Sequence, residues 1–250
     1  MKKIYYITAV FATLFLVGCG DGIDLPGVNV ETDLNKIPLP DNNVNLEQVE
    51  LKPSTEPMLH EGLHTEEDFQ RIRDKKAAGE EPWVSAYQLL VESQFSQKTA
   101  DTYPTEWIKR GISGDENYMN AARGATIVYQ QALRWKIEQD DEYAAKAVEN
   151  LNKWVQTCVG VTGNTNLSLA AGLYGYEFAI AGELLRDYGG WDRADFAAFQ
   201  NWLLKVFYPA NDDFLKRHHD TNALHYWANW CLCNICLLYT SPSPRDRSLS

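Results

Sequence analysis

The stretch from Leu167 to Leu185 constrains the fold most, because it is apolar on nearly every side and contains no Pro. At this length it is typical of a helix rather than a strand. A helix that is hydrophobic all round must be covered by other elements. We therefore expect a buried helix here, packed among other helices.

Helical patterns also occupy most of the chain on both sides of this stretch. Thr65 with Asp68 three residues later forms a capping-box pattern, which predicts a helix that begins there and continues until Gly79. Asp192 is expected to cap a later helix, which Pro209 ends. The remaining predicted helices are Trp83–Val91, Tyr118–Trp135 and a segment from Asp141 through Val155.

These helices follow one another as antiparallel pairs joined by short loops, with few strand signals. Alternating pairs suit an (α/α) toroid and equally a tetratricopeptide-like solenoid. The pairs share no fixed period or residue signature, which favours the toroid. We expect an all-α fold that is the N-terminal part of an incomplete (α/α) toroid.

The beginning of the chain has the pattern of an export signal. Lys2 and Lys3 precede a short apolar run, Ile4–Val17, and Leu-Val-Gly then leads into Cys19, which resembles a bacterial lipobox. We expect residues 1–18 to be a lipoprotein signal peptide and Cys19 to carry lipid that anchors the protein to a membrane. The alternative is a plain secretory signal with an incidental Cys. The expected location is exported, at the outer membrane or facing the periplasm of a Gram-negative bacterium.

Two further segments lie outside the predicted helical domain, which we place at residues 59–235. Residues 19–58 are rich in Pro, Asn, Asp and Glu and are expected to form a flexible tether. Residues 236–250 include CLLYTSPSPRD, which resembles the translation of a sequencing adapter. The alternative is a disordered Ser/Pro/Arg-rich tail. We expect this tail to be non-native and the natural helix to be cut off near Ile235.

The formal net charge of −11 argues against nucleic acid as a partner. An anionic polysaccharide remains a partner that a locally basic cleft could bind. Dense basic clusters occur at Arg71–Lys76 and at Lys216–His219. The first has the pattern of a solvated helix face, and the second adjoins the residues discussed next.

The segment Lys216–Trp230 holds three of the five His and two of the eight Trp. We expect a helix from Asn222 onward, on which Asn222, His225 and Asn229 share one face and Tyr226 lies beside it. Single His and Asn residues on such a helix are often hydrogen-bonded core groups. Their crowding beside the basic cluster favours a functional site.

Cysteine residues do not predict a metal site or a disulfide framework. Cys231, Cys233 and Cys236 stand at offsets that point in different directions on a helix, and Cys158 has no evident partner. We expect no metal and no cofactor.

The segment from His225 to Trp230, with Asn222 before it, resembles the Asn/His-containing helix of alginate-lyase-type polysaccharide lyases. Leu169–Arg186 and His60–Trp83 resemble two earlier segments of the same family in the same order, so the resemblance covers roughly residues 60 to 235. It implies a helical toroid and metal-independent β-elimination on a uronate polysaccharide such as alginate or a glucuronan-like polymer.

The resemblance also implies roles for individual residues. Asn222 and His225 would neutralise the substrate carboxylate, and Tyr226 is the candidate proton shuttle. His225 stands one position nearer the Tyr-Trp pair than in the family. The family's own shuttle Tyr comes from a later helix, so we expect this chain to be inactive or nearly so. Candidate substrate-binding residues are Arg217, His218, Trp227, Asn229, Trp230, Tyr174 and Tyr176, although aromatic residues at helical spacing are more often core.

Two other functions stay open. A monomeric, membrane-tethered glycan-binding protein without catalysis would show the same lipobox, tether and aromatic helices. A hydrolase would need a pair of carboxylates, and Asp220 is the only acidic residue of the Lys216–Trp230 segment.

Overall fold

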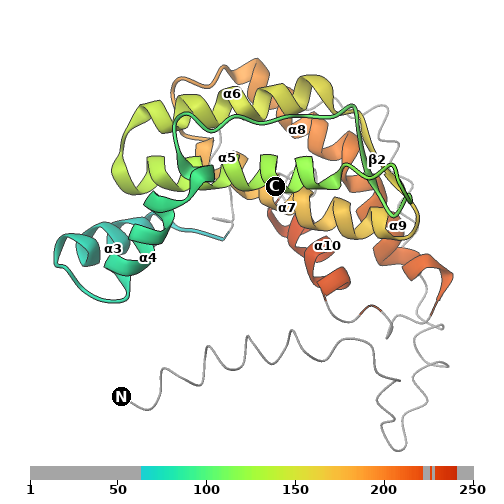
Figure 1. The fold of residues 1–250 in the computed structure, drawn as a ribbon, viewed down its shortest axis with the longest axis horizontal. Coiled ribbons are helices and arrows are strands. Elements are labelled where there is room, and N and C mark those ends of the chain that lie inside the picture. Colours follow the sequence, from blue (N-terminus) through green and yellow to red (C-terminus); the bar gives the residue numbers. More distant parts are fainter. Residues whose placement is uncertain (1–62, 222–225, 227–228, 241–250) are drawn as a thin grey trace, which may run out of the picture.

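The structure, a computed structural model, describes residues 63–221, 226 and 229–240 (Figure 1). Its α-helices are α3 (Glu66–Ala77), α4 (Trp83–Glu92), α5 (Tyr118–Glu138), α6 (Asp141–Thr157), α7 (Asn166–Leu185), α8 (Arg193–Val206), α9 (Tyr208–Arg217) and α10 (Asn229–Thr240). Short 3-10 turns occur at Gln94–Ser96 and His218–Asp220. The all-α fold class is confirmed. None of the helices in these ranges is long and apolar enough to cross a membrane.

The helices form two layers. α5, α7 and α10 pack side by side, and α6 and α8 pack on the other side of α5 and α7 (Figure 1). α3 and α4 lie against one end of α5. Alternating helices thus belong to alternate layers, as the predicted toroid requires, and the toroid itself stays a prediction.

The predicted burial of the apolar stretch is confirmed in α7, which lies between α5 and α10. Two of its glycines allow this close packing. A Cβ at Gly172 would lie 2.5 Å from the Cys233 sulfur of α10, and one at Gly175 would lie 3.0 Å from a methyl of Leu237. Helix α10 extends to Thr240 and so includes residues 236–240, which we assigned to the tail. Leu237, in this part of the helix, is buried.

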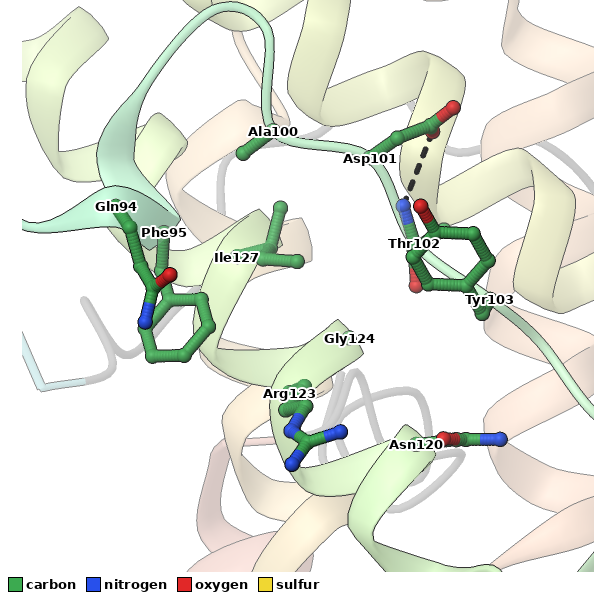
Figure 2. A pocket seen from close by; sticks show the side chains of 10 residues that line it. All are labelled: Gln94, Phe95, Ala100, Asp101, Thr102, Tyr103, Asn120, Arg123, Gly124 and Ile127. Carbon is green, nitrogen blue, oxygen red and sulfur yellow. Dashed lines mark hydrogen bonds between the residues drawn. The ribbon is translucent and has the colours of Figure 1, made fainter.

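A short parallel pair of strands, β1 (Trp107–Arg110) and β2 (Gly160–Gly163), joins the loops before α5 and before α7. Few strand signals are present in the sequence, because strands this short form through long-range pairing rather than local propensity. The segment between α4 and β1 crosses α5 and lines a small pocket with it (Figure 2).

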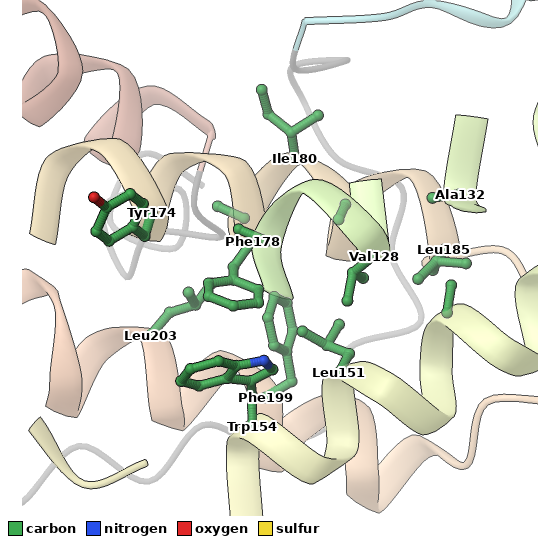
Figure 3. Close-up of a cluster of buried hydrophobic side chains, with 14 of the residues drawn as sticks. Val128, Ala132, Leu151, Trp154, Tyr174, Phe178, Ile180, Leu185, Phe199 and Leu203 are labelled. Atoms are coloured by element: carbon green, nitrogen blue, oxygen red, sulfur yellow. The ribbon is translucent and has the colours of Figure 1, made fainter. Parts of the chain in front are cut away.

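The core lies between the two layers and is rich in aromatic rings (Figure 3). Phe178 of α7 contacts Trp154 of α6 and Trp202 of α8, with ring centroids 5.4 and 5.2 Å apart. The N–H groups of both indoles are hydrogen-bonded. Trp154 donates to the Thr102 hydroxyl at 2.5 Å, and Trp202 donates to the Cys158 carbonyl at 2.8 Å. Burial of these large rings is the main stabilising contribution of the core.

The helix starts predicted from local sequence are confirmed. Thr65 and Asp68 form the capping box of α3, and the Asp192 side chain accepts from the backbone N–H of Ala194 to cap α8. The turn between α5 and α6 uses Gln139 in the left-handed conformation, with φ of 58°.

Two predicted boundaries near the C-terminal end are wrong. The helix capped by Asp192 ends at Val206, and Pro209 lies in the first turn of α9, where a missing N–H costs nothing. The α-helix expected from Asn222 onward does not run through Tyr226, which lies in a 3-10 turn, and α10 spans Asn229–Thr240. Tertiary contacts of the Tyr226 ring, described below, override the helical periodicity.

Candidate active site

The chain bends sharply after α9. His218, His219 and Asp220 all have positive φ, at 47°, 56° and 59°. Non-glycine residues rarely adopt this conformation, and each costs roughly 1–2 kcal/mol. Such strain persists only where surrounding contacts hold it, and it is often found at functional sites.

The bend places both imidazoles in a group of rings that we call the aromatic–histidine cluster: Phe214, His218, His219, Tyr226 and Trp230. Phe214 is fully buried beneath the other rings, and its ring centroid lies 5.2 Å from the centroids of His218, His219 and Tyr226. Tyr226 lies 5.5 Å from His219, 6.3 Å from His218 and 5.2 Å from Trp230. The structure thus brings together Tyr226, His218 and Trp230, which the sequence predicted as site residues.

The surroundings of His218 favour the neutral form of its imidazole. Burial lowers its pKa below the usual value, and the neighbouring His219 lowers it further. Its Nε2 lies 3.5 Å from the sulfur of Cys231. The Nε2 of His219 is buried and has no hydrogen-bond partner among the described residues. A neutral imidazole beside a phenol is a group that can accept a proton near neutral pH.

The basic residues at the end of α9 are already paired with carboxylates. Lys216 contacts Asp212 at 2.9 Å, and Arg217 contacts Asp213 at 2.6 Å and Asp220 at 3.3 Å. The Arg217 side chain is nevertheless 53% exposed. A guanidinium carries five N–H donors, so donors remain for a substrate carboxylate.

Several predicted site residues cannot be placed in this cluster. Asn222, His225 and Trp227 lie outside the described residues, as does Cys19. Asn229 is exposed at the first residue of α10.

The predicted sugar platforms Tyr174 and Tyr176 lie on α7, in a different environment. Tyr174 is buried, with 6% of its surface exposed, and its ring stacks on Tyr118 at 6.5 Å. Arg110 donates to the Tyr174 hydroxyl at 3.3 Å and covers the Tyr118 ring. The faces of Tyr174 are therefore occupied by protein. Tyr176 is half-buried.

Beside Tyr176, the structure reveals a titratable group that our sequence analysis missed. Glu177 is half-buried on α7, and burial raises the pKa of its carboxyl to about 7. The Thr126 hydroxyl of α5 lies 3.5 Å from it. A signal was present in the sequence, since Glu177 interrupts an otherwise apolar helix, where carboxylates are rare unless they are paired.

The side of α5 that carries Thr126 holds a further polar pair. Tyr129 follows Thr126 by three residues, and its hydroxyl lies 2.6 Å from Nε2 of His64. Burial raises the pKa of Tyr129 to about 12, and the nearby Tyr176 and Glu177 add to that shift. Groups on α5 and α7 are thus electrostatically linked along the contact between these helices.

No group of three or more His, Cys, Asp or Glu side chains among the placed residues could hold a metal ion. Near the C-terminal end, Cys233 is buried against Gly172, and Cys231 contacts only one imidazole, that of His218. The imidazole, phenol and guanidinium groups of the described site can transfer protons and form hydrogen bonds.

These features define an all-α protein of two helical layers, with a candidate proton-transfer site where α9 meets α10. The alginate lyase family model matches residues 72–243, and the chain belongs to this family. No curated protein and no solved structure matches it. Family membership supports a polysaccharide lyase function and a polysaccharide substrate.

Proposed function

We propose that this protein is a lyase that cleaves a uronate-containing polysaccharide, such as alginate or a glucuronan-like polymer, by β-elimination without a metal. The observation that carries the proposal is the position of the Tyr226 ring against His218 and His219, in a chain of the alginate lyase family. The phenol is a proton donor and acceptor, and burial lowers the pKa of the His218 imidazole beside it.

The reaction requires removal of the proton on C5 of a uronate unit and loss of the oxygen on C4. The electron pair of the C5–H bond forms the C4–C5 double bond, and the leaving oxygen takes up a proton. The substrate carboxylate must be neutralised before the C5 proton becomes acidic enough to remove. We assign that task to Asn222 and His225, with Arg217 as a further donor.

Tyr226 is the candidate proton shuttle in this scheme, with His218 as the neutral group that takes up its proton. Trp227, Asn229 and Trp230 are the proposed sugar contacts near it. The alginate lyase resemblance implies that a further Tyr, on a later helix, takes part in the proton transfer.

We further propose that the protein is exported and lipid-anchored at Cys19, and that it acts as a monomer. An anchored lyase would meet its polymer outside the cytoplasm. Replacement of Cys19 by Ala should release the protein from membranes in cell fractionation. Retention of that variant in the membrane fraction would contradict the anchor.

Elimination is tested by ultraviolet absorbance, because the C4–C5 double bond of the product absorbs there. The assay compares the chain with an extended chain, in which the coding sequence continues past Ile235 from its source DNA. Rising absorbance on alginate or glucuronan with the extended chain would support the proposal. A flat trace on every uronate polymer from a folded extended chain would reject it and favour glycan binding without catalysis.

A further inference from the structure

A pocket lies apart from the aromatic–histidine cluster, between α5 and the segment that precedes β1. Its volume is about 220 Å³. Gln94 and Phe95 form one wall and Tyr103 forms the opposite wall, as Figure 2 shows. The residues that line it are Gln94, Phe95, Ala100, Asp101, Thr102, Tyr103, Asn120, Arg123, Gly124 and Ile127.

Buried amides fix the wall formed by residues 97–102. Gln131 of α5 donates to the carbonyls of Gln97 and Ala100 at 2.9 and 3.1 Å. Asn150 of α6 donates to the same Ala100 carbonyl at 3.0 Å and accepts from the backbone N–H of Thr102 at 3.3 Å. Gln131 and Asn150 are both fully buried, so the wall is fixed before any ligand arrives.

The floor depends on a glycine. A Cβ at Gly124 would lie 2.3 Å from the indole nitrogen of Trp154 and 2.7 Å from the Thr102 hydroxyl. The absence of a side chain lets these two groups reach α5 and hydrogen-bond to each other at 2.5 Å. The pocket is therefore built on the packed core rather than on a mobile loop.

The polar groups of the pocket are free to bind a ligand. The Arg123 guanidinium is exposed and has neither an ion-pair nor a hydrogen-bond partner in the described ranges, and the side-chain amides of Asn120 and Gln94 are likewise unbonded there. Tyr103 is 75% exposed. These groups are a cation, two amides and an open aromatic ring.

The only carboxylate in the lining does not compete for Arg123. Asp101 pairs with Lys153 at 2.6 Å and Lys146 at 3.6 Å, and these contacts hold the pKa of its carboxyl below the usual value. Its carboxylate points away from the Arg123 guanidinium (Figure 2). Asp101 therefore leaves the Arg123 guanidinium unpaired within the lining of the pocket.

The pocket and the groups that face α7 lie on opposite sides of α5. Asn120, Arg123 and Ile127 are spaced as neighbours on one helical face. Tyr118 and Tyr129 stand about half a turn away on the helical wheel and contact Tyr174 and His64. None of the residues that line the pocket belongs to the aromatic–histidine cluster either, so a ligand here would not occupy the candidate active site.

We propose that this pocket binds a single carboxylate-bearing pyranose unit, with the carboxylate on Arg123, the ring against Tyr103 and the hydroxyls on Asn120 and Gln94. Guanidinium groups bind carboxylates by charge-assisted hydrogen bonds, and aromatic faces pack against the C–H faces of sugars. Pockets for drug-sized ligands typically exceed about 300 Å³, so this one is suited to one ring rather than a longer chain. The proposal goes beyond the lyase function, since it needs no turnover.

The test is a nuclear magnetic resonance titration of the full chain with methyl β-D-glucuronide and methyl β-D-glucoside, which differ in the carboxylate. We expect the glucuronide to shift backbone amides of residues 100–103 and 120–124, and to bind more tightly than the glucoside. R123Q should weaken glucuronide binding at these amides by about tenfold, the effect of one charge-assisted contact. R193Q, which changes an exposed arginine on α8, should leave it unchanged.

Two results would overturn the proposal. One is that the glucuronide and the glucoside bind with equal affinity, or that the original protein and R123Q bind the glucuronide with equal affinity. The other is that sodium sulfate shifts the same amides as strongly as the glucuronide and Y103A weakens neither, which would define a site for simple anions. The titration measures only binding, so a failure of the elimination assay would not affect its result. Thermal melting followed by circular dichroism checks that each variant is folded.

Discussion

Glu177 should make the stability of this protein depend on pH in the direction opposite to that of a salt-bridged carboxylate. Its pKa is raised from 4.5 to about 7 by burial on α7. The unfolded chain loses this proton near the ordinary value, whereas the folded protein keeps it until about pH 7. Stability therefore falls as pH rises between these two values and stays lower above them.

The magnitude follows from the size of the shift. One pKa unit corresponds to about 1.4 kcal/mol, so the shift corresponds to about 3 kcal/mol of stability lost above the folded pKa. Glu177→Gln keeps the shape and removes the charge. The variant should be more stable than the original protein by up to about 3 kcal/mol at about pH 8 and should differ little at about pH 5.

Urea unfolding followed by circular dichroism at both pH values measures this difference. Glu183→Gln is the matched control, because Glu183 lies on the same helix and pairs with Arg186 at 2.6 Å. That variant loses a compensated charge and should not gain stability at the higher pH. If Glu177→Gln leaves stability at the higher pH unchanged or lowers it, the reasoning about burial of Glu177 is refuted.

Three further predictions concern the caps, the core and the site. Thr65→Ala removes the capping box of α3 and should cost about 1 kcal/mol in urea unfolding, and no loss would contradict its role. Trp154→Ala should cost roughly 3–5 kcal/mol, because it opens a cavity and leaves the Thr102 hydroxyl unpaired; a loss below about 1 kcal/mol would contradict the packing described. Tyr226→Phe should lower the elimination rate of the extended chain at least about a hundredfold while its unfolding midpoint stays unchanged, and an undiminished rate would exclude Tyr226 as the shuttle.

Features set by neighbouring residues in the chain could be predicted from the sequence. The Thr65–Asp68 box and the Asp192 cap need only a few consecutive residues, and both form as expected. The burial of α7 followed from its uniform apolar character. In each case the local pattern and the tertiary structure favour the same conformation.

Features set by distant contacts could not be predicted. Pro209 is compatible with either the end of one helix or the first turn of the next, and here it lies in the next. The Tyr226 ring packs on Phe214 and His219, and Tyr226 lies in a 3-10 turn where the periodic pattern predicted an α-helix. The three left-handed residues after α9 carry no glycine signal that would have predicted the bend.

The candidate site was predicted in part. The sequence identified His218, Tyr226 and Trp230, which the structure brings together around Phe214. It did not predict that Arg217 pairs with two aspartates. The i,i+4 spacing of Asp213 was a local signal that the sequence analysis missed, whereas the pairing with Asp220 depends on the bend after α9. The roles of these side chains in elimination stay predictions.

The mass of the products that the extended chain forms from alginate or glucuronan tests the central claim most directly. Elimination leaves one new chain end with a C4–C5 double bond, whereas hydrolysis adds a molecule of water across the cleaved bond. We predict products with an unsaturated end in the first and in every later time point. Products with only saturated ends, or an intact polymer after incubation with the folded extended chain, would contradict the assignment as a uronate lyase.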